Sequence, residues 1–266
     1  MDFNIEELEW DSKGYIDFLE YLKSITDEKY QKFHASLLPE GIELIGIRTP
    51  ELKNIALRIR KSKPKEYLKY FFEYAASNKK AVFYDELMIA GFVISYMSHS
   101  FKGIKRKPFG EIKEYIDCFV KYIDNWAVCD MFCSNLRIKA EEQTEVFNYA
   151  KKYIASERTY EIRFGVVMLL AHFISEDKCI EILEIIFGVK SKEYYVNMAV
   201  AWCASMCYVK HSNTAGEYIL KLRNDYIANG YNEDEKFTFN MMLSKIRDSR
   251  QIKPDRKEYI KTLRLD

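Results

Sequence analysis

The sequence predicts an all-α protein, a right-handed α-α superhelix of HEAT-like two-helix repeats. Three observations predict it. Apolar residues recur at three- and four-residue intervals along most of the 266-residue chain, as they do on one face of a helix. Glycine and proline are scarce, ten and five in all, which argues against β-sandwiches and barrels because their turns need them. Helical segments with a polar first turn and an apolar body also return at intervals of about 40 residues.

The expected helices follow the chain in order. Residues 14–25 and 27–37 each carry one apolar face and predict a first helix pair. A stretch marked by glycine and proline, 37–50, precedes the next helix, for which Thr49 is the expected N-cap and Pro50 the first helical residue. Further helices are expected at 50–61, 64–76, 81–98, 108–122, 124–139, 141–154, 159–174, 177–188, 191–209, 212–228, 233–248 and 254–264. No segment alternates regularly enough to predict a strand.

The repeat is visible in three similar segments, YDELMIAGFVISYM (84–97), YEIRFGVVMLLAHF (160–173) and YYVNMAVAWCASMC (194–207). Tyr84, Tyr122 and Tyr160 are spaced 38 residues apart. Stacked pairs of this length form a solenoid whose concave side is lined by one helix of each pair. The alternative is an irregular helical globule. We expect one domain over 1–266, with an acidic N-terminal cap (1–43), a repeat array (44–250) and a basic C-terminal helix (251–266).

Charge is distributed unevenly, although the whole chain carries only +1. Residues 1–43 hold eleven acidic residues and four lysines, a net charge of −7. Residues 48–69 hold eight basic and two acidic residues, and 245–264 hold eight and three, giving +6 and +5. A smaller basic cluster occupies 102–107. Any one such run is typical of a solvated helix face, but three of them in one solenoid favour a surface that follows phosphates.

No secretory or membrane segment is expected. The first residues, MDFNIEELEWD, are acidic where a signal peptide is basic, and the longest apolar runs are too short to span a bilayer. Six cysteines without close spacing indicate reduced thiols and a cytoplasmic protein of the bacterial cytosol or nucleoid type. We expect a monomer with no membrane partner.

Metal and nucleotide sites are also not expected. Cys129 and Cys133, like Cys203 and Cys207, are four residues apart, and the two pairs could in principle form a four-thiolate site. Their apolar surroundings favour small buried residues instead. The four histidines show no ligand spacing, and no phosphate-binding glycine loop or GxSxG motif is present. We therefore expect no metal and no cofactor.

One helix is unusual. In YIDNWAVCDMFCSNLRI, Trp126 and Asp130 are four residues apart and share a face, and an acid in an apolar helix is costly to bury without a partner. Arg163 follows Asp130 by about one repeat, and Trp202 follows Arg163 by about another. In a regular solenoid these side chains would line one concave patch. The alternative is that Asp130 pairs with a neighbouring helix and that both tryptophans belong to the core.

The chain resembles the AlkD-like DNA alkylation repair glycosylases over roughly 15–250. The resemblance rests on GIRTPELKNIALRI (46–59), NWAVCDMFCSNL (125–136), the Arg163 repeat and YYVNMAVAWCASMCYVKH (194–211). In that family two tryptophans, an aspartate and an arginine form the working cleft, and they match Trp126, Trp202, Asp130 and Arg163. Departures are Ala127, where relatives often have an acid, and Ser205 with Met206, where they often have an Arg-Glu pair.

The resemblance implies a monofunctional glycosylase for cationic alkylpurines, such as 3-methyladenine and 7-methylguanine, in double-stranded DNA. It assigns the catalytic role to Asp130 and DNA contacts to Trp126, Trp202 and Arg163, with the lesion left stacked in the duplex. Because some relatives bind unusual DNA without excising bases, one alternative is a non-catalytic binder of damaged or branched DNA. A protein–protein scaffold is another, but it leaves these four residues unexplained.

Overall fold

The computed structural model describes residues 3–77 and 82–266, and the regular elements of the described chain are all helices, without a strand. It has two short 3-10 helices, η1 (Ile5–Glu7) and η2 (Ala140–Glu142), and fourteen α-helices. The α-helices are α1 (Ser12–Ser24), α2 (Glu28–Ala35), α3 (Thr49–Lys61), α4 (Pro64–Ser77), α5 (Tyr84–Met97), α6 (Phe109–Val120), α7 (Trp126–Asn135), α8 (Gln143–Ile154), α9 (Thr159–His172), α10 (Cys179–Phe187), α11 (Tyr194–Lys210), α12 (Ser212–Asn229), α13 (Glu233–Asp248) and α14 (Pro254–Lys261).

All fourteen expected helices are confirmed in the described chain; residue 81 of the expected 81–98 helix lies outside it. One detail was wrong. Helix α3 begins at Thr49, so its N-cap is Arg48, and no side chain caps it. Tyr122 lies in the turn after α6, whereas Tyr84 begins α5. The repeat is therefore less regular than the tyrosine spacing indicated.

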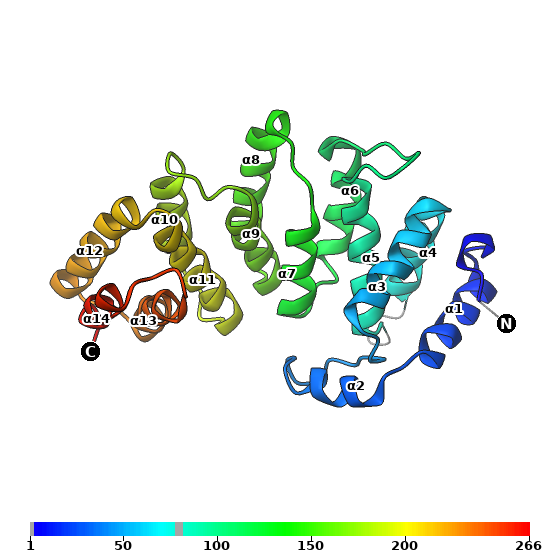
Figure 1. The fold of residues 1–266 in the computed structure, drawn as a ribbon, viewed down its shortest axis with the longest axis horizontal. Helices are drawn as coiled ribbons and strands as arrows, with labels where there is room; N and C mark the ends of the chain where they lie inside the picture. The colour runs from blue at the N-terminus through cyan, green and yellow to red at the C-terminus, as the bar shows by residue number, and fades with distance from the viewer. Residues whose placement is uncertain (1–2, 78–81) are drawn as a thin grey trace. The chain divides into compact units, whose positions relative to one another are not determined.

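Two compact units make up the chain, unit 1 over Met1–Gln143 and unit 2 over Thr144–Asp266. The expected single domain over 1–266, with its three parts, stays a prediction. In unit 1, α5 packs between α3 and α7, while α4 and α6 form a second row that packs on them (Figure 1). In unit 2, α11 packs between α9 and α13, and α10 and α12 pack beside it. Within each unit, this packing of helix pairs is that of a HEAT-like array.

Helix α5 is the centre of unit 1. Every residue of α5 except Tyr96 is buried, which agrees with a helix that is apolar on all sides. Side chains of neighbouring helices pack closely against it: a Cβ atom on Gly91 would lie 3.0 Å from the Phe119 ring. Two acids in its first turn, Asp85 and Glu86, are fully buried and hold the N-terminal segment.

The Asp85 carboxylate fixes the loop that leads into α3. It accepts backbone N–H bonds from Ile45 (2.6 Å), Gly46 (3.3 Å) and Ile47 (2.8 Å). Gly46 has φ +98°, and a Cβ there would lie 2.5 Å from the Gln31 side chain, so only glycine fits without a shift. The Gly46 carbonyl in turn accepts from the N–H of Asp27, the N-cap of α2. Asp85 thus holds α2 through the 45–47 loop.

Unit 2 has its own close contacts. At Gly165 of α9 a Cβ would lie 2.6 Å from the Ala150 carbonyl of α8, so the two helices pack backbone to backbone. At the other end of the unit the segment after α14 is held by three side chains. Arg223 donates to the Leu263 carbonyl at 2.8 Å, and Tyr231 donates to the Asp266 carbonyl at 3.0 Å. Asn240 forms two hydrogen bonds with the Leu265 backbone.

Candidate functional site

Helix α7 begins sharply at Trp126 because Asn125 caps it. The buried Asn125 side chain accepts from the N–H of Val128 at 3.0 Å and donates to Asp124 at 2.8 Å. The expected motif, Trp126 followed one turn later by Asp130, therefore occupies the first half of a well-anchored helix.

Trp126 and Asp130 are both half-buried, while Ala127, Val128 and Cys129 between them are buried. The indole Nε1 of Trp126 donates to the carbonyl of Leu37, just after α2, at 3.1 Å. This bond fixes the edge of the ring. Unit 1 thus presents an indole and a carboxylate, one turn apart on the same helix face, that a ligand can reach.

Unit 2 carries the other two expected residues on adjacent helices. Arg163 of α9 is only 5% exposed, and its Nη1 donates to the Tyr195 carbonyl in the first turn of α11 at 2.6 Å. Trp202 of α11 is half-buried. The structure therefore places the four residues as two pairs, one within each unit. Arg163 itself presents only a small exposed surface to a ligand.

The three positions that depart from the family pattern are mostly turned inward. Ala127 is buried, and so is Ser205, whose hydroxyl donates to the Trp202 carbonyl at 2.7 Å. Met206 is half-buried. Two of the three departures therefore lie where a side chain would contact the protein interior more than a ligand.

Many cations of the 48–69 stretch are engaged within unit 1. Three of them form ion pairs with acids of the N-terminal segment: Arg48 with Asp27, Arg58 with Glu6, and Lys63 with Glu9. A fourth, Arg60, is buried and donates to the carbonyls of Tyr96 and Lys105. The hydrogen bond from Arg58 lowers the pKa of Glu6 below its ordinary value, so this pair stays charged at neutral pH. These four cations are therefore already engaged within the protein, and fewer remain to bind phosphates.

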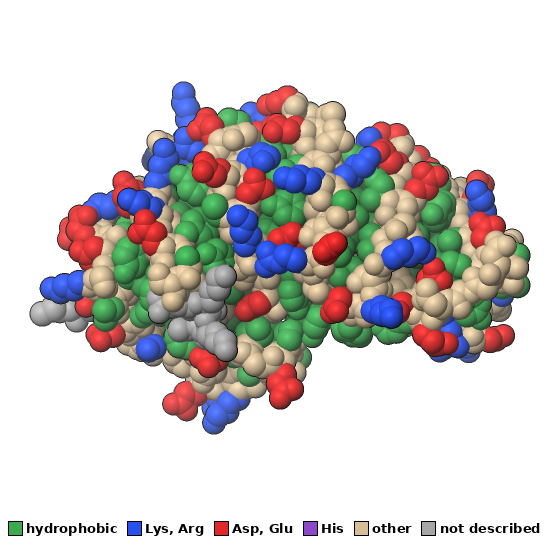
Figure 2. Space-filling model, turned by 180° about the vertical axis from the view of Figure 1, so that it is seen from behind, with side chains coloured by type: hydrophobic (Ala, Val, Ile, Leu, Met, Phe, Trp, Pro, Cys, Tyr) green, Lys and Arg blue, Asp and Glu red, His purple; other side chains and the backbone are tan. Residues whose placement is uncertain are grey.

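The other two basic clusters are engaged to different degrees. Arg106 of the 102–107 cluster forms an ion pair with Glu142 at 2.7 Å, and both side chains are largely buried. In the 245–264 stretch, Arg256 donates to the Tyr208 hydroxyl at 2.6 Å. On the face seen in Figure 2, basic and acidic side chains are interspersed over the surface.

Two buried acids, Asp85 and Glu86, were not predicted from the sequence. Burial raises the pKa of Asp85 above its ordinary value, although three backbone N–H bonds oppose the shift. Burial raises the pKa of Glu86 to about 7, and its carboxylate accepts a 2.6 Å hydrogen bond from Tyr15. An acid in an apolar helix, the signal that singled out Asp130, would have found both.

The cysteine pairs are part of the core. Cys129, Cys133, Cys203 and Cys207 are all buried thiols, as the apolar surroundings indicated. A hydrogen bond with Cys207, together with burial, raises the pKa of the Cys179 thiol well above its ordinary value. Residues 3–77 and 82–266 contain no group of three His, Cys, Asp or Glu side chains placed to hold a metal ion.

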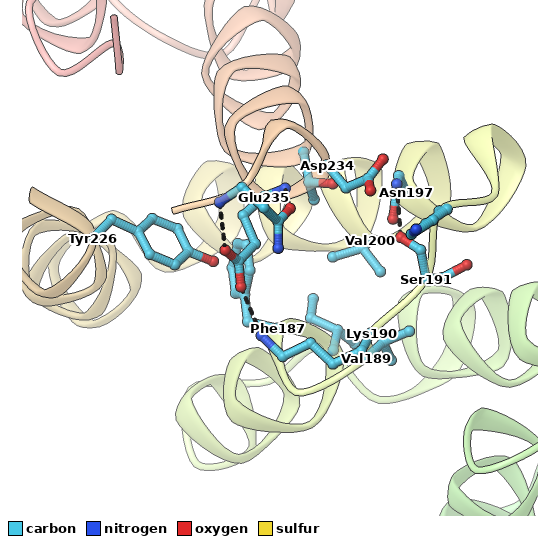
Figure 3. Close-up of a pocket in the computed structure, with 13 residues that line it drawn as sticks. Phe187, Val189, Lys190, Ser191, Asn197, Val200, Tyr226, Asp234 and Glu235 are labelled. Atoms are coloured by element: carbon cyan, nitrogen blue, oxygen red, sulfur yellow. Dashed lines mark hydrogen bonds and ion pairs between the residues drawn. The ribbon is translucent and has the colours of Figure 1, made fainter. Parts of the chain in front are cut away.

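A cavity of about 200 Å³ lies in unit 2 between the α10–α11 connection and the first turns of α13 (Figure 3). Several of its polar groups pair with one another. Lys190 forms a 2.7 Å ion pair with Glu235, which also accepts from the Asn232 N–H, and Asn197 donates to the Ser191 carbonyl. With Lys192 and Asp234, the lining holds two lysines and two acids, and therefore no net charge to attract an ionic ligand.

Comparison with known proteins identifies a family. The family model described as DNA alkylation repair enzyme matches residues 18–236, most of the chain, including all four expected site residues. No curated protein and no solved structure matches the chain significantly. No helix in the described part of the chain is long and apolar enough to span a membrane. The family match, with the Trp126–Asp130 pair on α7, shows that the chain belongs to the DNA alkylation repair enzyme family.

Proposed function

We propose that this chain is a monofunctional DNA glycosylase that hydrolyses the N-glycosidic bond of cationic alkylpurines, such as 3-methyladenine and 7-methylguanine, in duplex DNA. The observation that carries the proposal is the Trp126–Asp130 pair: an indole and a carboxylate, both half-buried, on one face of α7 within the family-matched stretch. Such an enzyme would act as a monomer where the chromosome lies, in the cytosol or nucleoid of a bacterial-type cell.

The proposed reaction needs a carboxylate but no strong general acid. A purine alkylated on a ring nitrogen is already cationic, so it leaves with the electron pair of the C1′–N bond and becomes neutral. The deoxyribose develops oxocarbenium character as that bond breaks. Asp130 would stabilise this positive charge and orient the water whose oxygen bonds to C1′, with the proton of that water passing to solvent.

The two tryptophans would contribute through their ring faces. An indole attracts a cation held over its face, and a sugar that becomes cationic gains this attraction only as the bond breaks. The Trp126 Nε1–Leu37 bond supports such a role, because it holds the ring without occupying its faces.

For Arg163 we propose a contact with a backbone phosphate. Its hydrogen bond to the Tyr195 carbonyl keeps the guanidinium in place, so the side chain would lose little entropy on binding. Because the residue is buried, the phosphate would meet only its small exposed part. We therefore expect Arg163 to orient the strand more than to supply affinity.

The decisive experiment compares release of 7-methylguanine from methylated duplex DNA by the wild-type protein and by Asp130→Asn. The amide keeps the size of the side chain and removes its charge. We expect excision to fall on the order of a hundredfold or more while duplex binding is retained. Asp17→Asn, an exposed change on α1, is the matched control and should excise like wild type.

The other outcomes identify the alternatives. Binding of duplex DNA by the wild-type protein without base release would contradict the glycosylase and favour a non-catalytic binder of damaged or branched DNA. Absence of DNA binding even at low salt would favour a protein–protein scaffold. Equal activity of Asp130→Asn and wild type would remove Asp130 from the mechanism.

A further inference from the structure

A second hollow in unit 2, here called the α13–α14 hollow, has a strongly basic lining. Its volume is about 370 Å³, within the range of ligand sites. Four cations line it, from one face of α13 and from the end of α14 and the segment after it. They are Lys236, Arg247, Lys261 and Arg264. Glu233 is the one acid in its lining. The lining side chains therefore carry a net charge of about +3 at neutral pH.

These four cations differ from those in the rest of the protein. Within the described chain none of them forms an ion pair, in contrast to Lys190 beside the neighbouring cavity (Figure 3) and to Arg48, Arg58 and Lys63 in unit 1. A cluster of like charges raises the free energy of the folded protein unless an anion joins it. The hollow therefore has the electrostatic character of an anion site.

The backbone around the hollow is held in place. Asn240, on the same face of α13, forms two hydrogen bonds with the Leu265 backbone, at 2.9 and 3.0 Å. Leu263 and Leu265 are buried on either side of Arg264, which is exposed. The segment after α14 is thus anchored by alternate residues, and Arg264 is presented from a fixed backbone. A fixed donor loses less entropy when it binds an anion.

An aromatic row leads from the Arg163 contact to this hollow across the first turns of α9, α11 and α13. Tyr160 packs on Tyr195, Tyr195 on Tyr194, and Tyr194 on Phe237, with ring centroids 6.0, 5.2 and 5.7 Å apart. Phe237 lines the hollow, and the Tyr195 carbonyl accepts from Arg163. Tyr194 is 54% exposed, unusual for so large a ring. Cations beside exposed rings are typical of surfaces that bind nucleic acid.

We propose that the α13–α14 hollow binds the phosphodiester backbone of DNA, as an anchor additional to the Trp/Asp/Arg site. The inference rests on the proposed function, because DNA is the polyanion that the family acts on. Three of its four cations, Arg247, Lys261 and Arg264, lie beyond the residues that match the family model. Such a contact is independent of sequence and sensitive to salt.

The test is the binding of a short undamaged duplex, measured by fluorescence anisotropy over a series of salt concentrations. Arg247→Gln with Arg264→Gln removes two cations of the hollow. We expect affinity to fall on the order of tenfold at moderate salt, and the salt dependence of log K to become shallower by about 0.9 for each phosphate that the variant no longer neutralises. Excision at saturating enzyme should stay at the wild-type rate. Lys152→Gln with Lys221→Gln, two exposed lysines on α8 and α12, is the control of equal charge.

Each outcome decides the question. Loss of affinity in the hollow variant but not in the control supports the anchor, provided that circular dichroism shows equal folding. Wild-type affinity in the hollow variant, or an equal loss in the control, overturns it even if the wild-type protein excises bases normally. A wild-type protein that binds no duplex overturns the proposed function and the anchor together. A wild-type protein that binds duplex DNA without excising bases overturns only the proposed glycosylase activity.

Discussion

Basic residues in the two units differ in whether they form ion pairs. In unit 1, three cations of the 48–69 stretch are neutralised by Glu6, Glu9 and Asp27. In unit 2, the four cations of the α13–α14 hollow have no acid within ion-pair distance in the described chain. Basic stretches that look alike in the sequence therefore differ in the fold: three cations of the one in unit 1 are paired with acids, and the four that line the hollow in unit 2 are not.

The difference shows what an acidic N-terminal segment does for a basic stretch beside it. Ion pairs with exposed partners contribute little to stability, so the value of these pairs lies more in the charge they remove from the surface. Where no such segment covers the cations, the charge remains available to a polyanion. The segment is held by two buried acids, Asp85 and Glu86, so changes at these residues should release it.

The largest effect is expected for Asp85→Ala, which removes the anchor of the 45–47 loop. Three backbone N–H groups, all on buried residues (Ile45, Gly46 and Ile47), lose their acceptor. We expect the free energy of unfolding to fall by roughly 3–5 kcal/mol, measured by urea denaturation. Limited proteolysis should then cut between α2 and α3.

Asp85→Asn is the control for that change, because it keeps one acceptor oxygen and nearly the same volume. Its stability should lie between those of wild type and Asp85→Ala. If Asp85→Ala were as stable as wild type, the loop would be held by something other than this carboxylate.

The next effect concerns pH and Glu86. Its pKa is about 7 in the folded protein and 4.5 in its ordinary state, so the folded protein binds this proton more tightly than the unfolded chain does. Stability from this residue is therefore present at low pH and is lost as pH rises from about 4.5 to 7, by about 3 kcal/mol in all.

Glu86→Gln should remove that dependence, because the amide stays neutral and can still bond with Tyr15 and the Phe83 N–H. The measurement is the thermal midpoint between pH 5 and 8 for wild type and variant. We expect the variant to be the more stable protein above pH 7, with a flatter profile. Parallel profiles would show that Glu86 titrates normally.

The sequence predicts the helices well because an amphipathic helix has a local pattern of apolar residues. Apolar periodicity placed all fourteen described α-helices. The N-cap of α3 was placed one residue late, at Thr49, because a threonine before a proline favours capping, whereas the structure uses the extended backbone of Arg48 without a side-chain bond. Local patterns thus find the helices and misplace some of their ends.

The contacts of the site could not be predicted from the sequence, because they join residues that are far apart along the chain. Nothing near Trp126 indicates a bond to Leu37, which is 89 residues away, and nothing near Arg58 indicates that Glu6, 52 residues away, neutralises it. The sign of a charge is visible in a sequence, but its partner is set by the fold. Burial of Arg163 likewise follows from the packing of α9 on α11 and not from its neighbours in the chain.

The smallest effect is expected when the paired cations of unit 1 are released from their acids. The triple variant Glu6→Gln, Glu9→Gln and Asp27→Asn would free Arg58, Lys63 and Arg48, while stability should change little because all three pairs are largely exposed. Since freed cations can bind phosphates, we expect the affinity for undamaged duplex to rise a few-fold at low salt, with a steeper salt dependence. The control variant adds the same charge without freeing a cation that is paired in the structure, by the exposed changes Glu7→Gln, Glu20→Gln and Glu28→Gln. An equal gain in both variants would mean that only net charge matters, whereas a gain confined to the first would show that the N-terminal acids withhold these cations from DNA.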